Sequence, residues 1–220
     1  LIRSEKLASL GKLSAGIAHE INTPLTVILT LSQLLMDEFP EESDAHQDLK
    51  LIVRETIRCR SIVRGLLDFA RQTAPEKVSI EINEVIQEIL RIVTTQESFQ
   101  NIRVETQYDP ENPRIMADLD QLKQGFFNVI VNASEAMGGN GKLKIVTQWE
   151  KDRSRIAVHC IDSGPGIPEE NLTRLFDPFF TTKEMGTGLG LAISYGILKA
   201  HRGNIEVRSK LGEGCEMIIT

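Results

Sequence analysis

Apolar residues in the first third of the chain recur in alternating steps of three and four, the spacing of one face of an α-helix. The first series is Leu7, Leu10, Ile17, Ile21, Ile28, Leu31 and Leu35. After a polar break at residues 39–44, the second series is Leu49, Ile52, Cys59, Val63, Leu66 and Ala70. Ser14, Pro24 and Thr56 interrupt the two series. The pattern predicts two helices joined as a hairpin over residues 4–72.

The apolar face of this predicted hairpin is too broad for one partner helix to cover. Ile57, Ile62, Leu67 and Phe69 lie beside the second series and widen its stripe. Apolar surface of that breadth is removed from water most economically when two hairpins associate. We therefore expect a homodimer in which two α hairpins form a four-helix bundle.

The pattern changes at residues 73–77, where a segment containing Pro75 interrupts the helical spacing and is predicted to be a linker. Beyond it, the periodicities predict helix 83–99, strand 102–108, helix 118–137, strands 143–149 and 155–161, helix 189–200 and a hairpin over 204–219. That order is typical of an α/β sandwich with helices on one face of a mixed sheet. The sequence thus predicts two domains, residues 1–74 and residues 75–220.

Composition narrows the classes of partner. A formal net charge of −6 over 220 residues disfavours nucleic acid and anionic membranes as the main partner. No apolar run approaches the roughly 20 residues that cross a bilayer. The sequence begins at Leu1 inside a predicted helix, so we expect a cytoplasmic fragment that reaches a membrane only through a missing N-terminal region, if at all. Cys59, Cys160 and Cys215 match neither a disulfide framework nor a zinc motif, and we expect reduced, buried thiols.

One histidine falls where the heptad directs side chains away from the bundle core. With Leu7 at position a, His19 is at position f. A histidine there has no packing role and is accessible to another domain. Gly16 precedes it within the helix at a cost of roughly 1 kcal/mol relative to Ala, which suggests that space around the imidazole is needed.

The residues after His19 support a functional interpretation. Pro24 removes a helical hydrogen bond to the Glu20 carbonyl, so a kink or loosened turn is expected there. Thr23 lies four residues after His19, on the same face of the helix. Glu20 is close enough for its long side chain to act as a base or acid, although an ordinary surface carboxylate is the simpler interpretation.

Two segments of the second domain present polar groups suited to a nucleotide. Asn128 and Asn132 are four residues apart on one helical face, and their amides offer oxygens to Mg²⁺ and donors to phosphate. Asp162 follows an apolar strand, where a carboxylate can accept the amine of adenine. Gly164 and Gly166 let the backbone approach the ring, although read alone the segment is only a turn.

Two further segments extend this site. Residues 176–183, FDPFFTTK, combine three phenylalanines with Lys183, which suggests a mobile lid whose lysine offsets phosphate charge, with Arg174 a weaker candidate. Residues 186–193, GTGLGLAI, lead into a helix and predict an anion site made of backbone N–H groups. The segment lacks the Gly-Lys-Ser/Thr ending of a Walker loop, and Leu191 stands where a dinucleotide fingerprint needs Gly.

Taken in order, these segments resemble the sequence boxes of sensor histidine kinases. The H box is residues 18–25, AHEINTPL, and the N box is residues 124–136, QGFFNVIVNASEA. The G1 box is DSGPGI from residue 162, and the F and G2 boxes are the two segments just described. The resemblance covers essentially the whole chain. Glu135 and Met137 differ from many relatives and point to the nitrogen-regulator-like branch.

The resemblance implies a Bergerat-type ATP-binding domain and a kinase that uses ATP (or ADP as product) with Mg²⁺. It makes His19 the phosphoacceptor, with Glu20 managing the other ring proton and Thr23 orienting water for a phosphatase reaction. It makes Asn128 the metal ligand and Asp162 the adenine-binding residue. The implied partner is the receiver domain of a response regulator, with no nucleic acid. The implied nucleotide contacts are Asn128, Asn132, Asp162, Gly164, Gly166, Lys183, Gly186, Thr187, Gly188, Leu189 and Gly190.

Three other functions remain open on the same nucleotide fold. An ATP-driven clamp or chaperone has no use for His19 followed by Glu20 and Pro24, which counts against that class. A dimeric scaffold with a dead ATP site does not require intact polar residues at Asn128 and Asp162. A kinase acting on Ser or Thr predicts acid-stable phosphate on a partner.

Overall fold

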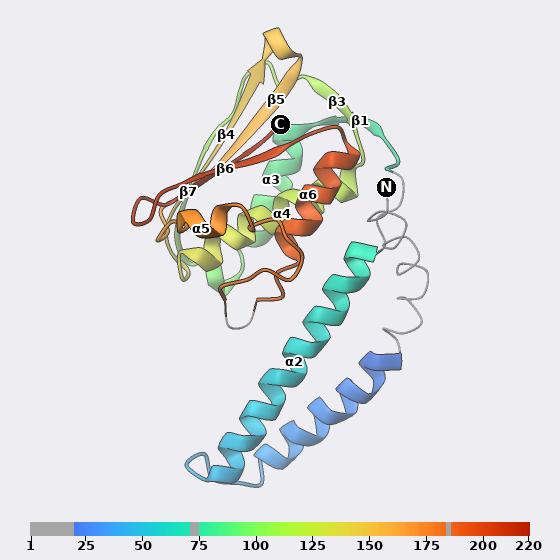
Figure 1. The fold of residues 1–220 in the computed structure, drawn as a ribbon, viewed down its shortest axis with the longest axis vertical. Helices are drawn as coiled ribbons and strands as arrows, with labels where there is room; N and C mark the ends of the chain where they lie inside the picture. Colours follow the sequence, from blue (N-terminus) through green and yellow to red (C-terminus); the bar gives the residue numbers. More distant parts are fainter. Residues whose placement is uncertain (1–19, 71–74, 184–185) are drawn as a thin grey trace. The chain divides into compact units, whose positions relative to one another are not determined.

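The computed structural model describes residues 20–70, 75–183 and 186–220, and Figure 1 draws their fold. These residues form two compact units. The first comprises the helical hairpin and the described part of segment 179–189, and the second comprises the other described residues from 75 onward. The predicted heptad positions up to Ile17, His19 and residues 73–74 of the predicted linker lie outside the described residues. The predicted domain boundary at residue 74 stays a prediction.

The first unit contains the predicted hairpin. Residues 20–36 form one helix, and α2 (Asp44–Ala70) forms the other. The turn between them is closed by Ser43, whose hydroxyl donates to the Pro40 carbonyl at 2.7 Å and accepts the His46 N–H at 3.2 Å. A serine at the start of a helix satisfies backbone donors that the helix itself leaves free. The prediction of a helical hairpin is confirmed.

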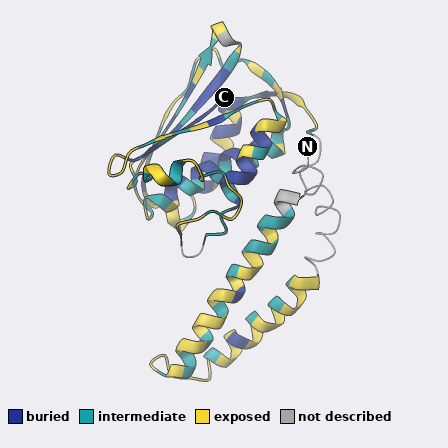
Figure 2. Ribbon diagram, in the orientation of Figure 1, coloured by how far each residue is buried: buried dark blue, intermediate teal, exposed yellow. Residues whose placement is uncertain are grey.

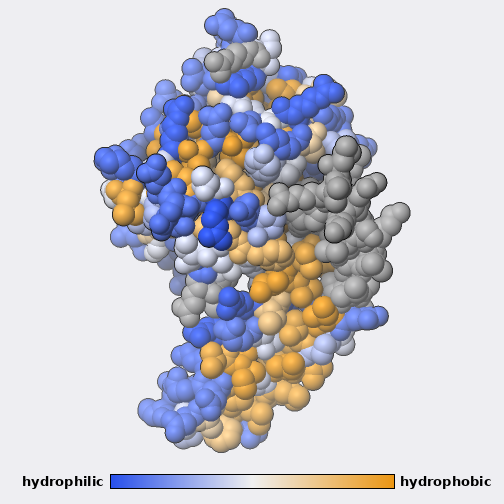
Figure 3. Space-filling view, viewed as in Figure 1, coloured by the Kyte–Doolittle hydropathy of each residue, from blue (hydrophilic) through white to orange (hydrophobic). Residues whose placement is uncertain are grey.

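Two small polar residues are the most deeply buried side chains of the described part of the hairpin. Ser32 and Thr56 are each only 6% exposed, and the Thr56 hydroxyl donates to the Ile52 carbonyl at 2.7 Å. About half of the large apolar side chains in the described part of the two helices are exposed in the single chain, and Figure 3 shows apolar surface gathered over both helices. These exposed residues are Ile21, Val27, Ile28, Leu31, Leu34, Leu35, Leu51, Ile52 and Ile57.

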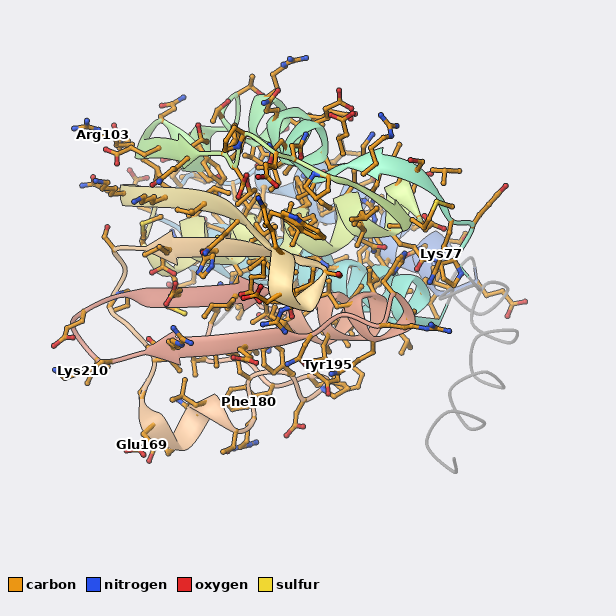
Figure 4. All side chains as sticks on the ribbon, turned by 90° about the horizontal axis from the view of Figure 1, so that it is seen from above. Lys77, Arg103, Glu169, Phe180, Tyr195 and Lys210 are labelled. Carbon is orange, nitrogen blue, oxygen red and sulfur yellow. The ribbon has the colours of Figure 1, made fainter. Side chains whose placement is uncertain are left out.

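A five-stranded mixed sheet forms the frame of the second unit, with the strand order β2-β4-β5-β7-β6. β2 pairs with β4 in parallel, and the other neighbouring pairs are antiparallel. Figure 4 shows Arg103 on β2 at one edge and Lys210, after β6, toward the other. The strands are β2 (Asn101–Gln107), β4 (Asn140–Glu150), β5 (Arg155–Asp162), β6 (Ile205–Ser209) and β7 (Cys215–Ile219).

Three helices cover one face of this sheet: α3 (Ile82–Val93), α4 (Leu119–Ala136) and α6 (Gly190–Ala200). Buried residues gather where these helices meet the strands (Figure 2). Leu143 on β4 and Ile130 on α4 are among the side chains that are almost fully buried there. The prediction of a mixed sheet with helices on one face is confirmed.

The structure differs from the predicted elements in two places. The helix predicted over 83–99 ends at Val93. Two β-branched residues of low helix propensity, Thr94 and Thr95, come next, and the 3₁₀ helix η1 (Glu97–Phe99) follows. A two-stranded sheet of β1 (Val78–Glu81) and β3 (Arg114–Ala117) was not predicted. Each of its strands has four residues, too few for a pattern of period two to stand out.

Short elements complete the second unit. The connection between β4 and β5 contains the 3₁₀ helix η2 (Lys151–Arg153), and α5 (Glu169–Leu172) follows the turn after β5. The four-residue α5 was not predicted.

All three cysteines are free thiols, as expected. Cys160 and Cys215 are buried, but Cys59 on α2 is exposed in the single chain. The expectation of burial is therefore wrong for Cys59 at the level of one chain. Cys59 belongs to the second apolar series, in which Ile52 is exposed as well.

Leu143→Ala should lower the free energy of unfolding of the second unit by about 2–5 kcal/mol, because it removes a fully buried side chain from the middle of β4. Trp149 on β4 is the only tryptophan in the sequence, so its fluorescence in a urea titration follows this unit alone. Leu211→Ala is the matched control, because Leu211 is 66% exposed. Equal changes in the free energy of unfolding for the two substitutions would contradict the burial of Leu143 in the core.

Candidate functional site

The residues that follow His19 lie on the exposed surface of the first helix. Glu20 and Thr23 are exposed, and the helix continues through Pro24 without a break. Thr26, one heptad after His19, is exposed as well, and its hydroxyl donates to the Asn22 carbonyl at 2.8 Å. His19 itself lies outside the described residues. The side chains of Glu20, Thr23 and Thr26 are therefore all exposed on this helix.

The structure brings two of the predicted motifs into direct contact. Asn128 lies in the middle of α4, and its side-chain Nδ2 donates to the carbonyl of Gly190 at 3.1 Å. Gly190 is the first residue of α6, where the backbone N–H groups have no partner within the helix. Asn132 lies one turn further along α4 and is partly buried, with a polar partner of its own. Amide oxygens and helix N–H groups thus meet at one place.

Asp162 ends β5 and is held by its surroundings. It is only 7% exposed, and its Oδ1 accepts the N–H of Gly164 at 2.9 Å. β7 pairs beside it, with Cys215 opposite Asp162 in the register. A Cβ on Gly214 would lie 2.2 Å from the Asp162 carbonyl oxygen, so only glycine allows β7 to approach this closely.

The turn after Asp162 is pinned by the hairpin between β6 and β7. Gly166 has φ +74°, and a Cβ there would lie 2.2 Å from the Lys210 carbonyl oxygen. The N–H of Gly212 donates to the Pro165 carbonyl at 2.7 Å. The carboxylate and the glycine turn are therefore positioned by a strand pair some fifty residues later in the chain.

Two buried thiols lie beside Asp162. Burial raises the pKa of Cys160 far above its usual range and raises that of Cys215 to about 12, and the negative charge of Asp162 adds to both shifts. Because the thiolate is the nucleophile and the metal ligand, these cysteines serve neither role at neutral pH. Cys215 was not predicted to belong to this site, since nothing in the sequence pairs it with Asp162.

Segment 179–189 closes on itself. The N–H of Phe179 donates to the Gly188 carbonyl at 3.0 Å, and Gly188 has φ +66° with no space for a Cβ beside Phe179. Within this loop, the N–H of Gly186 donates to the Lys183 carbonyl at 3.2 Å, and the Thr187 hydroxyl accepts the Leu189 N–H at 3.4 Å. These contacts give the loop its own shape.

The phenylalanines predicted to form a lid differ in exposure. Phe176 stacks on Tyr195 of α6, with ring centroids 5.4 Å apart. Phe180 is partly buried, and Phe179 is 57% exposed. A shared docking of all three rings over a nucleotide stays a prediction.

One pocket of about 350 Å³ opens beside Asp162. It is lined by β5, β6, β7 and the turn between the last two, with Arg208 and Lys210 facing Glu213 and Glu216 among its charges. Its lining includes no residue of α4 or of the glycine segment. The contact between Asn128 and Gly190 therefore locates the candidate site better than this pocket does.

Within the described ranges, no group of three or more His, Cys, Asp or Glu side chains is arranged to hold a metal ion. A metal there would depend on amide, water or phosphate oxygens, such as the Asn128 amide provides. The same described ranges contain no helix with the length and apolarity needed to cross a membrane.

Two known protein families match parts of this chain. Residues 9–75 match the family described as His Kinase A (phospho-acceptor) domain. Residues 117–220 match the family described as histidine kinase-, DNA gyrase B- and HSP90-like ATPase. The first match covers the described hairpin, and the second covers α4, α6 and the strands β4 to β7 but not α3 or β2.

Individual relatives agree with these matches. The chain is 36% identical to the catalytic domain of the histidine kinase ThkA, with a TM-score of 0.59 over 66% of this chain and 93% of that structure. The chain belongs to the sensor histidine kinases. Sensor histidine kinase ZraS of Klebsiella oxytoca is 37% identical over 96% of this chain, and the signal transduction histidine-protein kinase AtoS of Escherichia coli K12 is 36% identical over 97%.

The chain spans about half or less of these curated sensor histidine kinases, 46% of ZraS and 35% of AtoS. A structure of ThkA in complex with the response regulator protein TrrA is 31% identical, with a TM-score of 0.70 over 99% of this chain and 63% of that chain. The match of residues 9–75 to the phospho-acceptor family favours a histidine kinase over an ATP-driven clamp. The predicted nitrogen-regulator-like branch stays a prediction.

Gly214→Ala should weaken binding of a fluorescent ADP analogue by on the order of tenfold or more, because a Cβ at this position pushes on the Asp162 backbone. Gly212→Ala is the matched control: Gly212 has a similar positive φ, but a Cβ there meets nothing within 4 Å. Both proteins carry the same backbone strain, so only the first should lose affinity. Equal affinities would show that the position of Asp162 does not matter for the nucleotide.

Proposed function

We propose that this chain is the catalytic core of a sensor histidine kinase and transfers the γ-phosphoryl group of ATP to His19. The observation that carries the proposal is the hydrogen bond from Asn128 to Gly190, which joins the amide motif to the glycine motif at the start of α6. In a family whose members are named histidine kinases, that junction is suited to a triphosphate. The exposed H-box helix supplies the acceptor.

The nucleotide binds across the end of β5 and the start of α6. The Asp162 carboxylate accepts the exocyclic amine of adenine, while Gly164 and Gly166 allow the ring to approach the backbone. The free N–H groups at the start of α6 bind phosphate oxygens, aided by the positive end of the helix dipole. Lys183 adds positive charge, and Asn132, Gly186, Thr187, Gly188 and Leu189 complete the contacts.

The residues present fit a magnesium ion. Asn128 donates through Nδ2, so its Oδ1 keeps the lone pairs that a hard cation prefers. Asn128 Oδ1 would hold Mg²⁺ at this place, and the ion would supply positive charge that offsets the negative charge developing on phosphate during transfer. The chain's own part is to hold Oδ1 in place, which the bond to Gly190 does.

The transfer step forms one P–N bond and breaks one P–O bond. A ring nitrogen of His19 attacks the γ-phosphorus with its lone pair, and ADP leaves with the electrons of the broken bond. The imidazole would then carry an extra positive charge, and Glu20 accepts the proton on the other ring nitrogen. Catalysis of this kind depends on positioning and electrostatics rather than on a covalent intermediate. Thr23, on the same helical face, orients water when the regulator is dephosphorylated.

The partners follow from the hairpin. About half of the large apolar side chains in its described part are exposed in one chain, and a second copy covers them in a four-helix bundle (Figure 3). The phosphoryl group then passes from His19 to an aspartate of a response-regulator receiver. The ThkA relative, whose structure is a complex with a response regulator protein, supports this choice of partner.

Incubation with radiolabelled ATP and Mg²⁺ should label the chain with phosphate that is lost in acid and kept in alkali. His19→Gln should reduce the label to background, because the acceptor nitrogen is gone. His159→Gln is the matched control, since His159 lies on β5 with Nδ1 2.8 Å from Glu216 Oε1, away from the proposed site. Autoradiography before and after acid treatment measures the amount of label and its loss in acid for each protein.

Each rival function predicts a different result. A scaffold with a dead ATP site gives no label in the unchanged protein. A kinase for Ser or Thr gives acid-stable phosphate on a partner. Label that survives His19→Gln would contradict the assignment of the phosphoacceptor.

A further inference from the structure

α4 and α6 pack side by side in opposite directions, and polar contacts fix one against the other. Near the proposed phosphate site, Asn128 bonds to Gly190. Further along, the Ser194 hydroxyl, which is fully buried, donates to the Gly125 carbonyl at 3.0 Å. The residue numbers fall along α4 as they rise along α6, which is the sign of an antiparallel pair.

A third contact joins the other end of the pair, and it involves a histidine. His201 follows the last residue of α6, and its Nε2 lies 2.9 Å from the backbone nitrogen of Asp118 at the start of α4. Its Nδ1 lies 2.8 Å from the Ile197 carbonyl oxygen. Because a carbonyl oxygen only accepts, Nδ1 carries the proton and Nε2 is left as an acceptor. That is the form in which the ring accepts the Asp118 N–H.

Asp118 connects this contact to the chain that follows the linker. Its Oδ1 accepts the N–H of Gln121 at 3.0 Å as a helix cap, and its Oδ2 accepts the N–H of Glu76 at 2.9 Å. These two N–H groups, Gln121 first, hold the pKa of the Asp118 carboxyl below its usual range. Figure 4 shows Lys77, next to Glu76, at the opposite end of the unit from Lys210, which lines the pocket beside Asp162.

We propose that His201 is a positioning residue for the nucleotide: by accepting the Asp118 N–H, it fixes the placement of α6 on α4 and thereby the contact of Asn128 with Gly190. The proposal rests on the proposed function, since the ligand that it positions is ATP. Through the bond from Glu76 to Asp118, the same contact ties the start of the second unit to the nucleotide site.

The mechanical reason lies in the spacing along α6. Ser194 is a buried contact near the middle of the helix, with Gly190 four residues before it and His201 seven residues after it. At about 1.5 Å per residue, these ends lie about 6 and 10 Å from that point along the axis. Buried apolar residues such as Ile193 and Ile197 hold this stiff helix in the core, and the polar contact at His201 fixes the position of its far end relative to α4. Without it, Gly190 and the phosphate-binding N–H groups lose their fixed position.

Two substitutions separate this role from ordinary packing. His201→Asn retains an amide that can donate to the Ile197 carbonyl, but it is too short to accept the Asp118 N–H. His201→Gln is longer and places an amide oxygen near the position of Nε2, so it can accept that N–H. If His201 did no more than close the end of α6, the His201→Asn and His201→Gln proteins would bind nucleotide equally well.

The full chain is assayed for autophosphorylation over a range of ATP concentrations, and for binding of a fluorescent ADP analogue with Mg²⁺. His201→Asn should raise the KM for ATP and weaken ADP binding by about tenfold, with little change in kcat. His201→Gln should restore both values to within about twofold of the unchanged protein. His159→Asn, the same substitution on β5, is the control and should leave both unchanged.

Equal KM values for His201→Asn and the unchanged protein would overturn the proposal. So would an equal loss of ADP affinity in His201→Asn and His201→Gln. If His201→Asn fails to fold, amide hydrogen exchange in the unchanged protein gives a second test. Coupling is reciprocal, so ADP should slow exchange of the Asp118 amide, and no change would overturn the proposal. If the proposed function itself were wrong, the unchanged protein would neither bind ADP nor be labelled by radioactive ATP. That result differs from a failure of the His201 proposal alone.

Discussion

The packing of α4 against α6 is the constraint on which the rest of the second unit depends. Asn128 and Gly190 are 62 residues apart in the sequence and meet only because these two helices pack together. The fully buried hydroxyl of Ser194, bonded to the Gly125 carbonyl, leaves no freedom for the helices to slide. A buried polar group without its partner is costly, so the registry of the pair is well specified. The sheet supports both helices from one side and leaves the start of α6 free to bind an anion.

The second constraint is the close approach of β7 to β5. Gly214 lets the strand lie against the Asp162 backbone, and Gly166 lets the following turn lie against Lys210. The carboxylate thus stands at the end of a strand, fixed by neighbours on both sides rather than carried on a loop. A group that recognises a base benefits from such support, because little ordering remains when the ligand binds. By contrast, the hairpin exposes its apolar residues and is suited to association with a second copy.

Local patterns were enough to predict the hairpin, α4, the mixed sheet and each separate motif. The spacing of Asn128 and Asn132 needs only a helix, and the position of Asp162 needs only the end of a strand. What could not be predicted depends on contacts between distant segments. The bond from Asp118 to His201 joins residues 83 apart, and the pairing of Cys215 with Asp162 depends on the strand order. Helix α3 ends at Val93, before two β-branched threonines of low helix propensity, which apolar periodicity does not take into account.

In the proposed reaction, phosphate from ATP becomes bonded to a histidine nitrogen of this chain. Phosphorus NMR on protein grown with ¹⁵N-labelled histidine tests that bond directly. After incubation with ATP and Mg²⁺ and removal of nucleotide at alkaline pH, we predict one protein-bound phosphorus resonance that is split by coupling to ¹⁵N. A protein-bound resonance without that splitting would mean that the phosphate is attached to oxygen, and it would contradict phosphorylation of a histidine.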